Sequence, residues 1–305
     1  MTAALYNRAM KQEKYFSKID DRIVLKENTT IAITGATGSI GKSIASFFSN
    51  REVNLLLIGR NKKKLEKLSS FLSNRKAHIE TYCLDISSVT DVKESLPYLK
   101  DKNIDIFYNN AGVFRKPIEE NEELDVSFKT DYLVPILFVK ELYKSNKEMV
   151  FINTASISYH YHDFDYDIQG RNIDSRIKRY GFLKRLLIME TNYLREKGIR
   201  CYLAHPGISY TGLFSKENNA YPKFVLSLIR LPMKLLFMSP DKASLSLIES
   251  SCLHPDSTHE YLGPRGLFHS WGYPGFQKLS DKLFDEKECA YLDEKTDEYI
   301  QKFYL

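Results

Sequence analysis

Short apolar runs alternate with longer amphipathic segments between residues 29 and 204. The runs have the length of strands, and apolar positions in the segments between them recur every three or four residues, as on one face of a helix. The run 53–58 is apolar at nearly every position, which is typical of strands covered by helices on both faces. The alternation predicts the α/β class, with a doubly wound parallel sheet of the Rossmann type flanked by helices. The predicted strands cover residues 30–34, 53–58, 77–84, 104–108, 149–154 and 199–204, and the predicted helices cover 40–48, 62–72, 89–99, 121–144 and 178–197.

The pattern changes at both ends of this alternation. Residues 1–28 are charged and carry only a weak apolar stripe, so we expect a helical leader without a chemical role. Residues 29–305 are expected to form a single domain. Its C-terminal extension, from about residue 255, is rich in turn residues and aromatics and ends in an amphipathic helix near 286–304.

Composition narrows the function classes without choosing one. Hydrophobic residues make up 43% and charged residues 27% of the 305 positions, which is ordinary for a globular protein. The net charge of +5 is spread along the chain and gives no basic patch for a nucleic acid. The four cysteines lack C-x-x-C spacing, which argues against a zinc site and against a disulfide framework. With no apolar run resembling a signal peptide or a spanning helix, we expect a cytoplasmic location.

Three glycines, Gly35, Gly38 and Gly41, lie between the first predicted strand and the helix that follows it. Glycine permits a tight turn and a close backbone approach, and a helix N-terminus offers free N–H groups and a positive dipole end. The turn is therefore predicted to bind a phosphate group. Its spacing differs from the common G-x-G-x-x-G pattern, and on its own a tight turn without a ligand explains it as well.

A tyrosine and a lysine, Tyr180 and Lys184, stand one helical turn apart on the same face of the predicted helix 178–197. A nearby ammonium lowers the pKa of a phenol, which allows the phenol to exchange a proton with a substrate hydroxyl. The hydroxyl of Ser156, which follows a predicted strand, can orient the same oxygen. This set suits carbonyl reduction or alcohol oxidation with a nicotinamide as hydride donor or acceptor.

Together these motifs resemble those of the short-chain dehydrogenase/reductase family. The resemblance implies that Tyr180 is the general acid/base, that Lys184 lowers its pKa and holds the nicotinamide ribose, and that Ser156 positions the substrate oxygen. It covers about residues 29–250 and depends on the glycine turn, Asp85-Ile86, N-N-A-G at 109–112, Ser156, Y-x-x-x-K at 180–184 and P-G-I-S-Y-T at 206–211.

The same resemblance implies a dinucleotide site along the carboxyl ends of the strands. Asp85 and Ile86 would contact the adenine, Asn110 would lie on the adenosine side, and Thr211 would contact the nicotinamide amide or the pyrophosphate. The complete predicted cofactor-binding set is Gly35, Thr37, Gly38, Ser39, Ile40, Gly41, Arg60, Asn61, Asp85, Ile86, Asn110, Ala111, Gly112, Thr154, Tyr180, Lys184, Pro206, Gly207, Ile208 and Thr211.

Three features depart from the family pattern. Ser39 stands where the shorter members carry glycine, and the resulting glycine spacing resembles the extended, epimerase-like branch. Asp131 occupies the position that usually supplies a proton-relay asparagine, so it either holds the relay water or pairs with Lys184 and weakens its effect on Tyr180. About ten extra residues separate Ser156 from Tyr180, as in the branch of retinol dehydrogenases and protochlorophyllide reductases.

The extra residues contain alternating aspartates and two histidines: Asp163, Asp165, Asp167, His160 and His162. The aspartates alternate as in a calcium loop, but the glycine is displaced and no glutamate closes the loop. An aromatic, polar rim beside the active site explains the composition without a metal, so no metal is predicted.

The end of the second strand bears on the choice of cofactor. Sites for NAD usually place an acid there, whereas an arginine accommodates the 2′-phosphate of NADP. Residues 59–64 contain Arg60 and three lysines but no acid, which favours NADP and leaves NAD possible. The lysines at 62–64 are equally well explained as a solvated helix face.

The substrate is less defined than the cofactor. By the resemblance, residues 212–240 form a substrate lid, and their apolar, cationic sequence suits an apolar carbonyl or alcohol, contact with a membrane surface, or packing on the body. The resemblance also suggests a homodimer or homotetramer through helices flanking the active site. Two alternatives stay open: a nucleotide-sugar epimerase or dehydratase of the extended branch, and a non-catalytic NADP(H)-binding sensor.

Overall fold

A computed structural model describes residues 12–114, 116–118, 122–209, 237–266 and 269–305. Its centre is an eight-stranded sheet in the order β3-β2-β1-β4-β5-β6-β7-β8. All neighbouring strands are parallel except β7 and β8, which are antiparallel. The strands are β1 (Thr30–Thr34), β2 (Asn54–Gly59), β3 (His78–Cys83), β4 (Ile106–Asn109), β5 (Val150–Thr154), β6 (Cys201–Ala204), β7 (Glu260–Pro264) and β8 (Pro274–Lys278).

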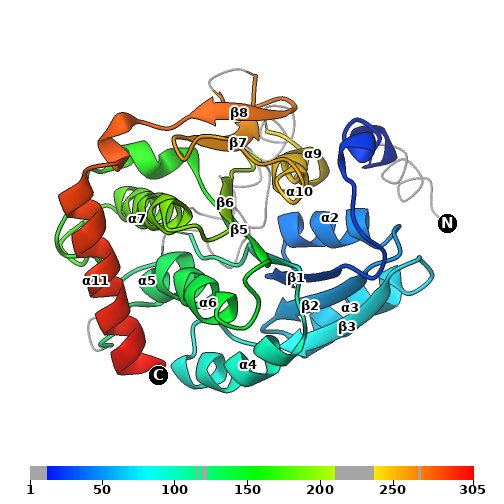
Figure 1. The fold of residues 1–305 in the computed structure, drawn as a ribbon, viewed down its shortest axis with the longest axis horizontal. Coiled ribbons are helices and arrows are strands. Elements are labelled where there is room, and N and C mark those ends of the chain that lie inside the picture. Colours follow the sequence, from blue (N-terminus) through cyan, green and yellow to red (C-terminus); the bar gives the residue numbers. More distant parts are fainter. Residues whose placement is uncertain (1–11, 115, 119–121, 210–236, 267–268) are drawn as a thin grey trace, which may run out of the picture.

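Helices cover both faces of the sheet, which confirms the predicted doubly wound α/β fold (Figure 1). The sheet has a hydrophobic core on each face, and successive residues of β1 point alternately into the two cores. Ala32 packs with α4, α6 and α7, whereas Ile31 and Ile33 pack with α2 and α3. The helices of the described ranges are α2 (Ser39–Phe48), α3 (Lys62–Leu72), α4 (Val89–Asp101), α5 (Val126–Phe128), α6 (Val134–Tyr143), α7 (Arg176–Glu196), α9 (Pro240–Ala243), α10 (Leu245–Glu249) and α11 (Glu286–Phe303).

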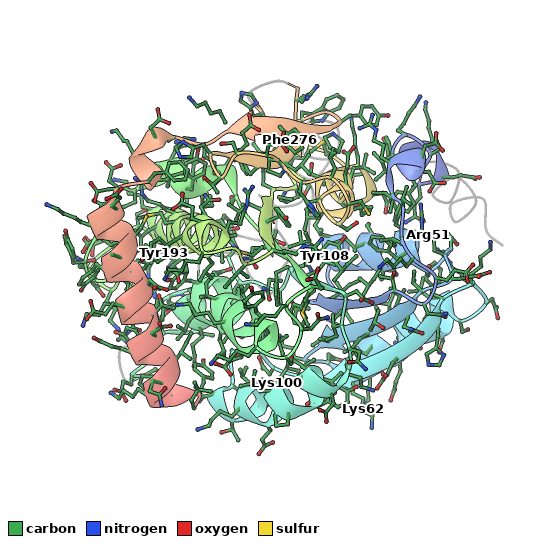
Figure 2. The ribbon with its side chains drawn as sticks, viewed as in Figure 1. Arg51, Lys62, Lys100, Tyr108, Tyr193 and Phe276 are labelled. Carbon is green, nitrogen blue, oxygen red and sulfur yellow. The ribbon has the colours of Figure 1, made fainter. Side chains whose placement is uncertain are left out.

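Two differences from the predicted elements concern the site. The helix predicted at 121–144 is interrupted: α5 is joined to α6 by a π-helical turn, Lys129–Leu133, which contains Asp131. Strands β7 and β8 are absent from the predicted elements, because glycine and proline, which both strands contain, are typical of turns. Tyr108 of β4 lies at the centre of the molecule, whereas Lys62 and Lys100 lie at its edge (Figure 2).

The chain ends pack on opposite faces. Phe16 lies edge-on to Phe47 of α2, with ring centroids 5.0 Å apart. On the other face, the Lys140 ammonium of α6 lies 3.1 Å from Glu190 of α7 and 2.6 Å from Asp293 of α11. Burial raises the pKa of the Glu190 carboxyl to about 8. The lysine thus joins α11 to the two helices that precede and follow β5.

The described helices include none with the length and apolar character needed to cross a membrane. The segment assigned to the lid lies almost wholly outside the described residues, because these resume only at residue 237.

Candidate active site

The glycine turn is packed so closely that side chains would not fit. Gly35 has a φ of +63°, and a Cβ placed there would lie 2.9 Å from the Cα of Ala111. A Cβ at Gly41 would lie 2.4 Å from the carbonyl oxygen of Gly35. The turn therefore brings the end of β1, the start of α2 and the segment after β4 into direct contact.

The N-terminus of α2 lacks the side-chain cap that α3, α4, α7 and α11 have. Side chains cap α3, α4, α7 and α11, through Asn61, Ser88, Ser175 and Asp285 respectively. Gly38 precedes α2, and no side chain caps this helix. An uncapped N-terminus behind a glycine turn presents N–H groups and a positive dipole end to an anion, so this region fits the pyrophosphate of a dinucleotide.

A threonine missing from the predicted site residues fixes the segment after β4. The Thr34 hydroxyl accepts hydrogen bonds from the backbone N–H groups of Asn110 (3.0 Å) and Ala111 (3.1 Å). The Asn110 amide in turn donates to the carbonyl oxygens of Thr34 (2.9 Å) and Gly35 (3.4 Å). In this structure Asn110 therefore ties the glycine turn to β4.

The end of β2 lies beside the same turn. A Cβ at Gly59 would be 3.6 Å from the Thr37 hydroxyl, and the exposed Arg60 follows directly. Asn61, predicted to bind the cofactor, accepts a hydrogen bond from the N–H of Lys64 (3.0 Å) as the cap of α3. Arg60 and Asn61 are both exposed, and the cap occupies only the side-chain oxygen of Asn61.

The residues after β3 form a compact turn. Asp85 accepts hydrogen bonds from the N–H (3.0 Å) and the hydroxyl (2.7 Å) of Ser87. Ile86 packs partly buried against the core. Both residues follow the carboxyl end of β3, and ligands of parallel sheets bind at this edge. Their position is therefore compatible with the predicted contacts to adenine.

Tyr180, Lys184 and Ser156 converge beside this edge. The Lys184 ammonium lies 5.8 Å from the centroid of the Tyr180 ring and donates to the carbonyl oxygen of Thr154 (3.0 Å). The Ser156 hydroxyl is a hydrogen-bonding neighbour of the Tyr180 phenol. Ser156 is itself 2.8 Å from the hydroxyl of Ser158, at the start of the 3₁₀ helix Ile157–Tyr161.

Gly181 explains how the serine comes so close to α7. A Cβ at Gly181 would lie 2.3 Å from the carbonyl oxygen of Ser158. Any larger residue after Tyr180 would therefore push the serine segment away from the helix.

Asp131 lies at the same centre and is almost fully buried. One carboxylate oxygen is 3.6 Å from the Lys184 ammonium and accepts a hydrogen bond from the N–H of Val113 (3.2 Å). A Cβ at Gly112 would lie 2.5 Å from that oxygen, so the last glycine of N-N-A-G makes room for the contact. Burial raises the pKa of Asp131 to about 6, although Lys184 and Val113 oppose the shift.

The pKa of Tyr180 is raised in this arrangement. Burial raises the pKa of the Tyr180 phenol, and the negative charge of Asp131 raises it further. Burial also lowers the pKa of Lys184, although Asp131 opposes this shift. Asp131 lies within ion-pair distance of Lys184, as one of its two expected roles requires.

A buried histidine shapes the loop after β6. His205 is fully buried, and its Nδ1 accepts a hydrogen bond from the N–H of Gly207 (3.2 Å), whose φ is +68°. Burial lowers the pKa of His205 to about 4, so the ring is neutral and Nε2–H donates to the Gln277 side chain of β8 (3.1 Å). A Cβ at Gly263 would lie 1.9 Å from that nitrogen. The glycine therefore leaves room for the His205 ring beside the β7–β8 pair, which was not predicted.

The other predicted residues of this loop are only partly described. Pro206 is half-buried, and Ile208 is exposed at the surface. The N–H of Ile208 donates to the carbonyl oxygen of Ser270 (3.0 Å), which anchors the loop to the β7–β8 connection. Thr211 lies outside the described residues.

The aspartates of the inserted segment organise its own backbone. Asp165 accepts from the N–H of Asp167 (2.9 Å), and Asp167 accepts from those of Gln169 (3.3 Å) and Arg171 (2.7 Å). Among the described residues, no group of three His, Cys, Asp or Glu side chains is arranged to hold a metal ion. Hydrogen bonding to the loop thus accounts for two of the three alternating aspartates.

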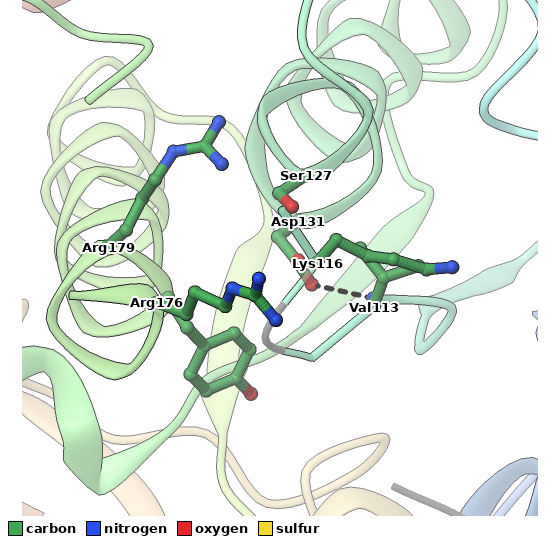
Figure 3. A pocket seen from close by; sticks show the side chains of 7 residues that line it. Val113, Lys116, Ser127, Asp131, Arg176 and Arg179 are labelled. Atoms are coloured by element: carbon green, nitrogen blue, oxygen red, sulfur yellow. Dashed lines mark hydrogen bonds between the residues drawn. The ribbon is translucent and has the colours of Figure 1, made fainter. Parts of the chain in front are cut away.

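A small pocket opens against Tyr180. It is lined by Val113, Lys116, Ser127, Asp131, Arg176, Arg179 and Tyr180 (Figure 3). The lining is polar and cationic, and no local pattern predicts it, because its residues come together from three separate segments.

The fold and the site define a nucleotide-binding α/β protein of the Rossmann type. Residues 29–162 match the family model described as short chain dehydrogenase. Uncharacterized oxidoreductase YxbG of Bacillus subtilis is 29% identical over 281 residues, which are 85% of this chain and 98% of the relative. Retinol dehydrogenase 13 of Mus musculus is 26% identical over 236 residues, 70% of this chain and 69% of the relative. The match to this family model and the similarity to these oxidoreductases confirm the resemblance to short-chain dehydrogenases seen in the motifs.

Solved structures agree at the level of the fold. A short-chain dehydrogenase from Sphingobium yanoikuyae in complex with NADPH has a TM-score of 0.55 and 18% identity, over 72% of this chain and 82% of that one. One from Burkholderia phymatum in complex with NAD has a TM-score of 0.57 and 18% identity, over 75% and 87%. The two neighbours carry different nicotinamide cofactors, NADPH in the first and NAD in the second.

Proposed function

We propose that this chain is an NADP-preferring oxidoreductase that interconverts a carbonyl and an alcohol. The observation that carries the proposal is the convergence of Ser156, Tyr180 and Lys184 beside the glycine turn and the uncapped start of α2. One end of this arrangement suits a pyrophosphate and the other suits a proton donor for a reacting oxygen.

The side chains divide the work around a bound nicotinamide, which supplies or accepts the hydride. Tyr180 donates its phenolic proton to the oxygen of the carbonyl during reduction and takes it back during oxidation. Ser156 donates a hydrogen bond to the same oxygen. Lys184, held by Thr154 and Asp131, would bind the ribose of a bound nicotinamide and would return a proton to the Tyr180 phenolate after reduction.

Asp131 is proposed to act with Lys184 in this proton transfer. It is buried against the ammonium, and its second carboxylate oxygen has no hydrogen-bond partner among the described residues. A buried acceptor of this kind suits a bound water or a shuttled proton. It takes the place of the relay asparagine and carries a charge that an asparagine lacks.

The preference for NADP is proposed from Arg60. Its guanidinium is exposed after β2, next to the glycine turn, where the 2′-phosphate would lie. The acid that would hold an NAD ribose is missing from residues 59–64. Charge-assisted hydrogen bonds from arginine to phosphate are among the stronger polar contacts.

The test is the consumption of NADPH with a panel of aldehydes and ketones, with Tyr180→Phe as the matched variant. We expect turnover with at least one carbonyl, and a loss of about 10²- to 10⁴-fold in Tyr180→Phe with cofactor binding retained. Tight NADPH binding without turnover of any carbonyl would favour the sensor instead. Conversion of a nucleotide sugar without net NADPH consumption would favour the epimerase.

Three further expectations belong to the proposal: an apolar body of the substrate, a cytoplasmic location, and a homodimer or homotetramer. Phe114, which meets the Tyr180 ring edge-on at 4.8 Å, supports an apolar wall. Helix α11 packs on α7, one of the helices beside the active site, and so covers part of the surface that a second subunit would contact. A symmetric interface would use the surfaces that α11 leaves exposed.

A further inference from the structure

The pocket beside Tyr180 contains more positive than negative charge. Lys116, Arg176 and Arg179 line it, and Asp131 is the acidic residue of its lining (Figure 3). Cations next to a catalytic phenol change which substrates fit, because a charged group of the substrate must be matched when it leaves water.

Two of these charges are already neutralised inside the protein. Arg179 is buried and forms an ion pair with the equally buried Asp125, the cap of α5. Asp131 faces the Lys184 ammonium at 3.6 Å. Neither charge therefore requires a group from a ligand.

Arg176 is in a different situation. It is exposed and begins α7, and within the described part of the chain it has neither an ion pair nor a side-chain hydrogen bond. Its guanidinium points from α7 toward the segment that holds Val113 (Figure 3). The positive end of the dipole of α7, a helix of 21 residues, adds to the charge of this side chain.

Lys116 contributes from the other side. It follows β4 and is half-buried, and its side chain extends away from Arg176 (Figure 3). Its ammonium therefore adds to the positive potential of the pocket, while the direct contact with a ligand belongs to Arg176.

The spacing links this charge to the reaction. Arg176 precedes Tyr180 by four residues, so the two side chains are neighbours on one face of α7. Phe114 packs edge-on against the Tyr180 ring and forms an apolar surface beside it. A ligand that places a carbonyl at Tyr180 can lie along this surface and present a second group to Arg176.

We propose that the substrate carries a carboxylate or a phosphate group, which Arg176 binds while the carbonyl or alcohol lies at Tyr180. The inference depends on the proposed oxidoreductase function and specifies its substrate as an oxo or hydroxy acid, or the corresponding phosphate. The planar guanidinium donates two parallel hydrogen bonds to either anion. The guanidinium therefore selects an anionic ligand and also fixes the orientation of that ligand at Tyr180.

The experiment compares each acid with its neutral ester. The probes are 3- and 4-carboxybenzaldehyde and the corresponding methyl formylbenzoates, with formylphenyl phosphate as the phosphate arm, and NADPH oxidation is followed at low salt. We expect kcat/KM to be about tenfold higher for the anions, since a hydrogen bond to a charged group is lost with the ester. Arg176→Gln should remove this preference mainly through KM, and Arg176→Lys should retain part of it.

Lys178→Gln is the matched control, because Lys178 is an exposed cation of the same helix two residues further on. It should leave the preference for anions unchanged. Equal kcat/KM for anions and esters, or an equal effect of Arg176→Gln on both, would overturn this inference and leave the reductase activity standing. Reduction of none of these aldehydes, nor of any in the wider panel, would overturn the proposed function together with it.

Discussion

Around the glycine turn, backbone atoms approach so closely that an added methyl group would collide, whereas around Lys184 the close neighbours are charged side chains. At the turn, a Cβ on Gly41 would meet the Gly35 carbonyl at 2.4 Å. At the lysine, Asp131 lies 3.6 Å from the ammonium in a buried setting. The first region is shaped by sterics, and the second by protonation states that depend on one another.

Because of this difference, we expect substitutions to have different effects in the two regions. A steric cradle fails when atoms are added, at any pH. A buried ion pair changes with pH and with the removal of charge, and its geometry can survive both.

The largest effect is expected for Gly41→Ala. Alanine normally stabilises a helix by about 0.5–1 kcal/mol relative to glycine. Here the methyl group would collide with the backbone, so we expect the free energy of unfolding to fall by about 1–3 kcal/mol. We also expect NADPH affinity to fall about 100-fold, because the helix N-terminus shifts. Thermal unfolding and cofactor titration measure the two effects.

Gly59→Ala is the control for that variant, because its Cβ would make only ordinary contacts, the nearest at 3.6 Å. Its unfolding free energy should change by less than about 1 kcal/mol. Equal stability of the two variants would show that the turn is less constrained than its geometry indicates.

A smaller, pH-dependent effect is expected for Asp131→Asn. Burial raises the pKa of Asp131 from 3.8 to about 6, so its contribution to stability is present below pH 4 and lost as the pH rises through 6. Between these values wild type should lose about 3 kcal/mol of unfolding free energy relative to Asp131→Asn. Denaturant unfolding at several pH values measures this slope, with the exposed Asp101→Asn as the control.

The same variant tests the role of the carboxylate in catalysis. Removing the charge of Asp131 lowers the pKa of Tyr180, so the alkaline limb of the pH–rate profile should move to lower pH. We expect activity near neutral pH to be kept or raised. A large loss with an unchanged fold would mean that the carboxylate itself is required.

The smallest effect is expected for Arg60→Gln, which changes neither the turn nor the buried pair. We expect KM for NADPH to rise about tenfold and KM for NADH to stay nearly constant, since only the former carries a 2′-phosphate. Lys63→Gln, an exposed lysine on α3, is the control. An equal rise for both cofactors would assign Arg60 a structural role.

The two regions also differ in how far the sequence predicts them. The strands up to β6 and the glycine turn can be predicted from local sequence patterns. Apolar runs indicate buried strands, and glycines indicate positions where the backbone needs unusual conformational freedom. The pKa of Tyr180 does not follow, since it depends on burial and on Asp131, a residue distant in sequence. Motif spacing placed Lys184 beside the phenol and named pairing with Asp131 as one of two alternatives, but only the folded arrangement gives the 3.6 Å separation between the two charges.

The β7–β8 pair and its link to His205 lie beyond local patterns for a similar reason. Gly263 is explained by the His205 ring that fills the space of its missing Cβ, a contact between residues far apart in the chain. The cationic pocket likewise draws Lys116, Asp131 and Arg176 from three segments. Contacts of this kind depend on the folded arrangement.

The transfer of deuterium from the nicotinamide ring to a carbonyl carbon tests the central claim most directly. Purified protein is given NADPH deuterated at C4, in separate 4R and 4S forms, with the aldehyde that shows the highest turnover. We predict that one form alone labels the product alcohol at its carbinol carbon, and that Tyr180→Phe suppresses the labelling while still binding NADPH. Product that stays unlabelled with both deuterated forms, or equal labelling by wild type and Tyr180→Phe, would contradict the assignment of this site as an oxidoreductase centre.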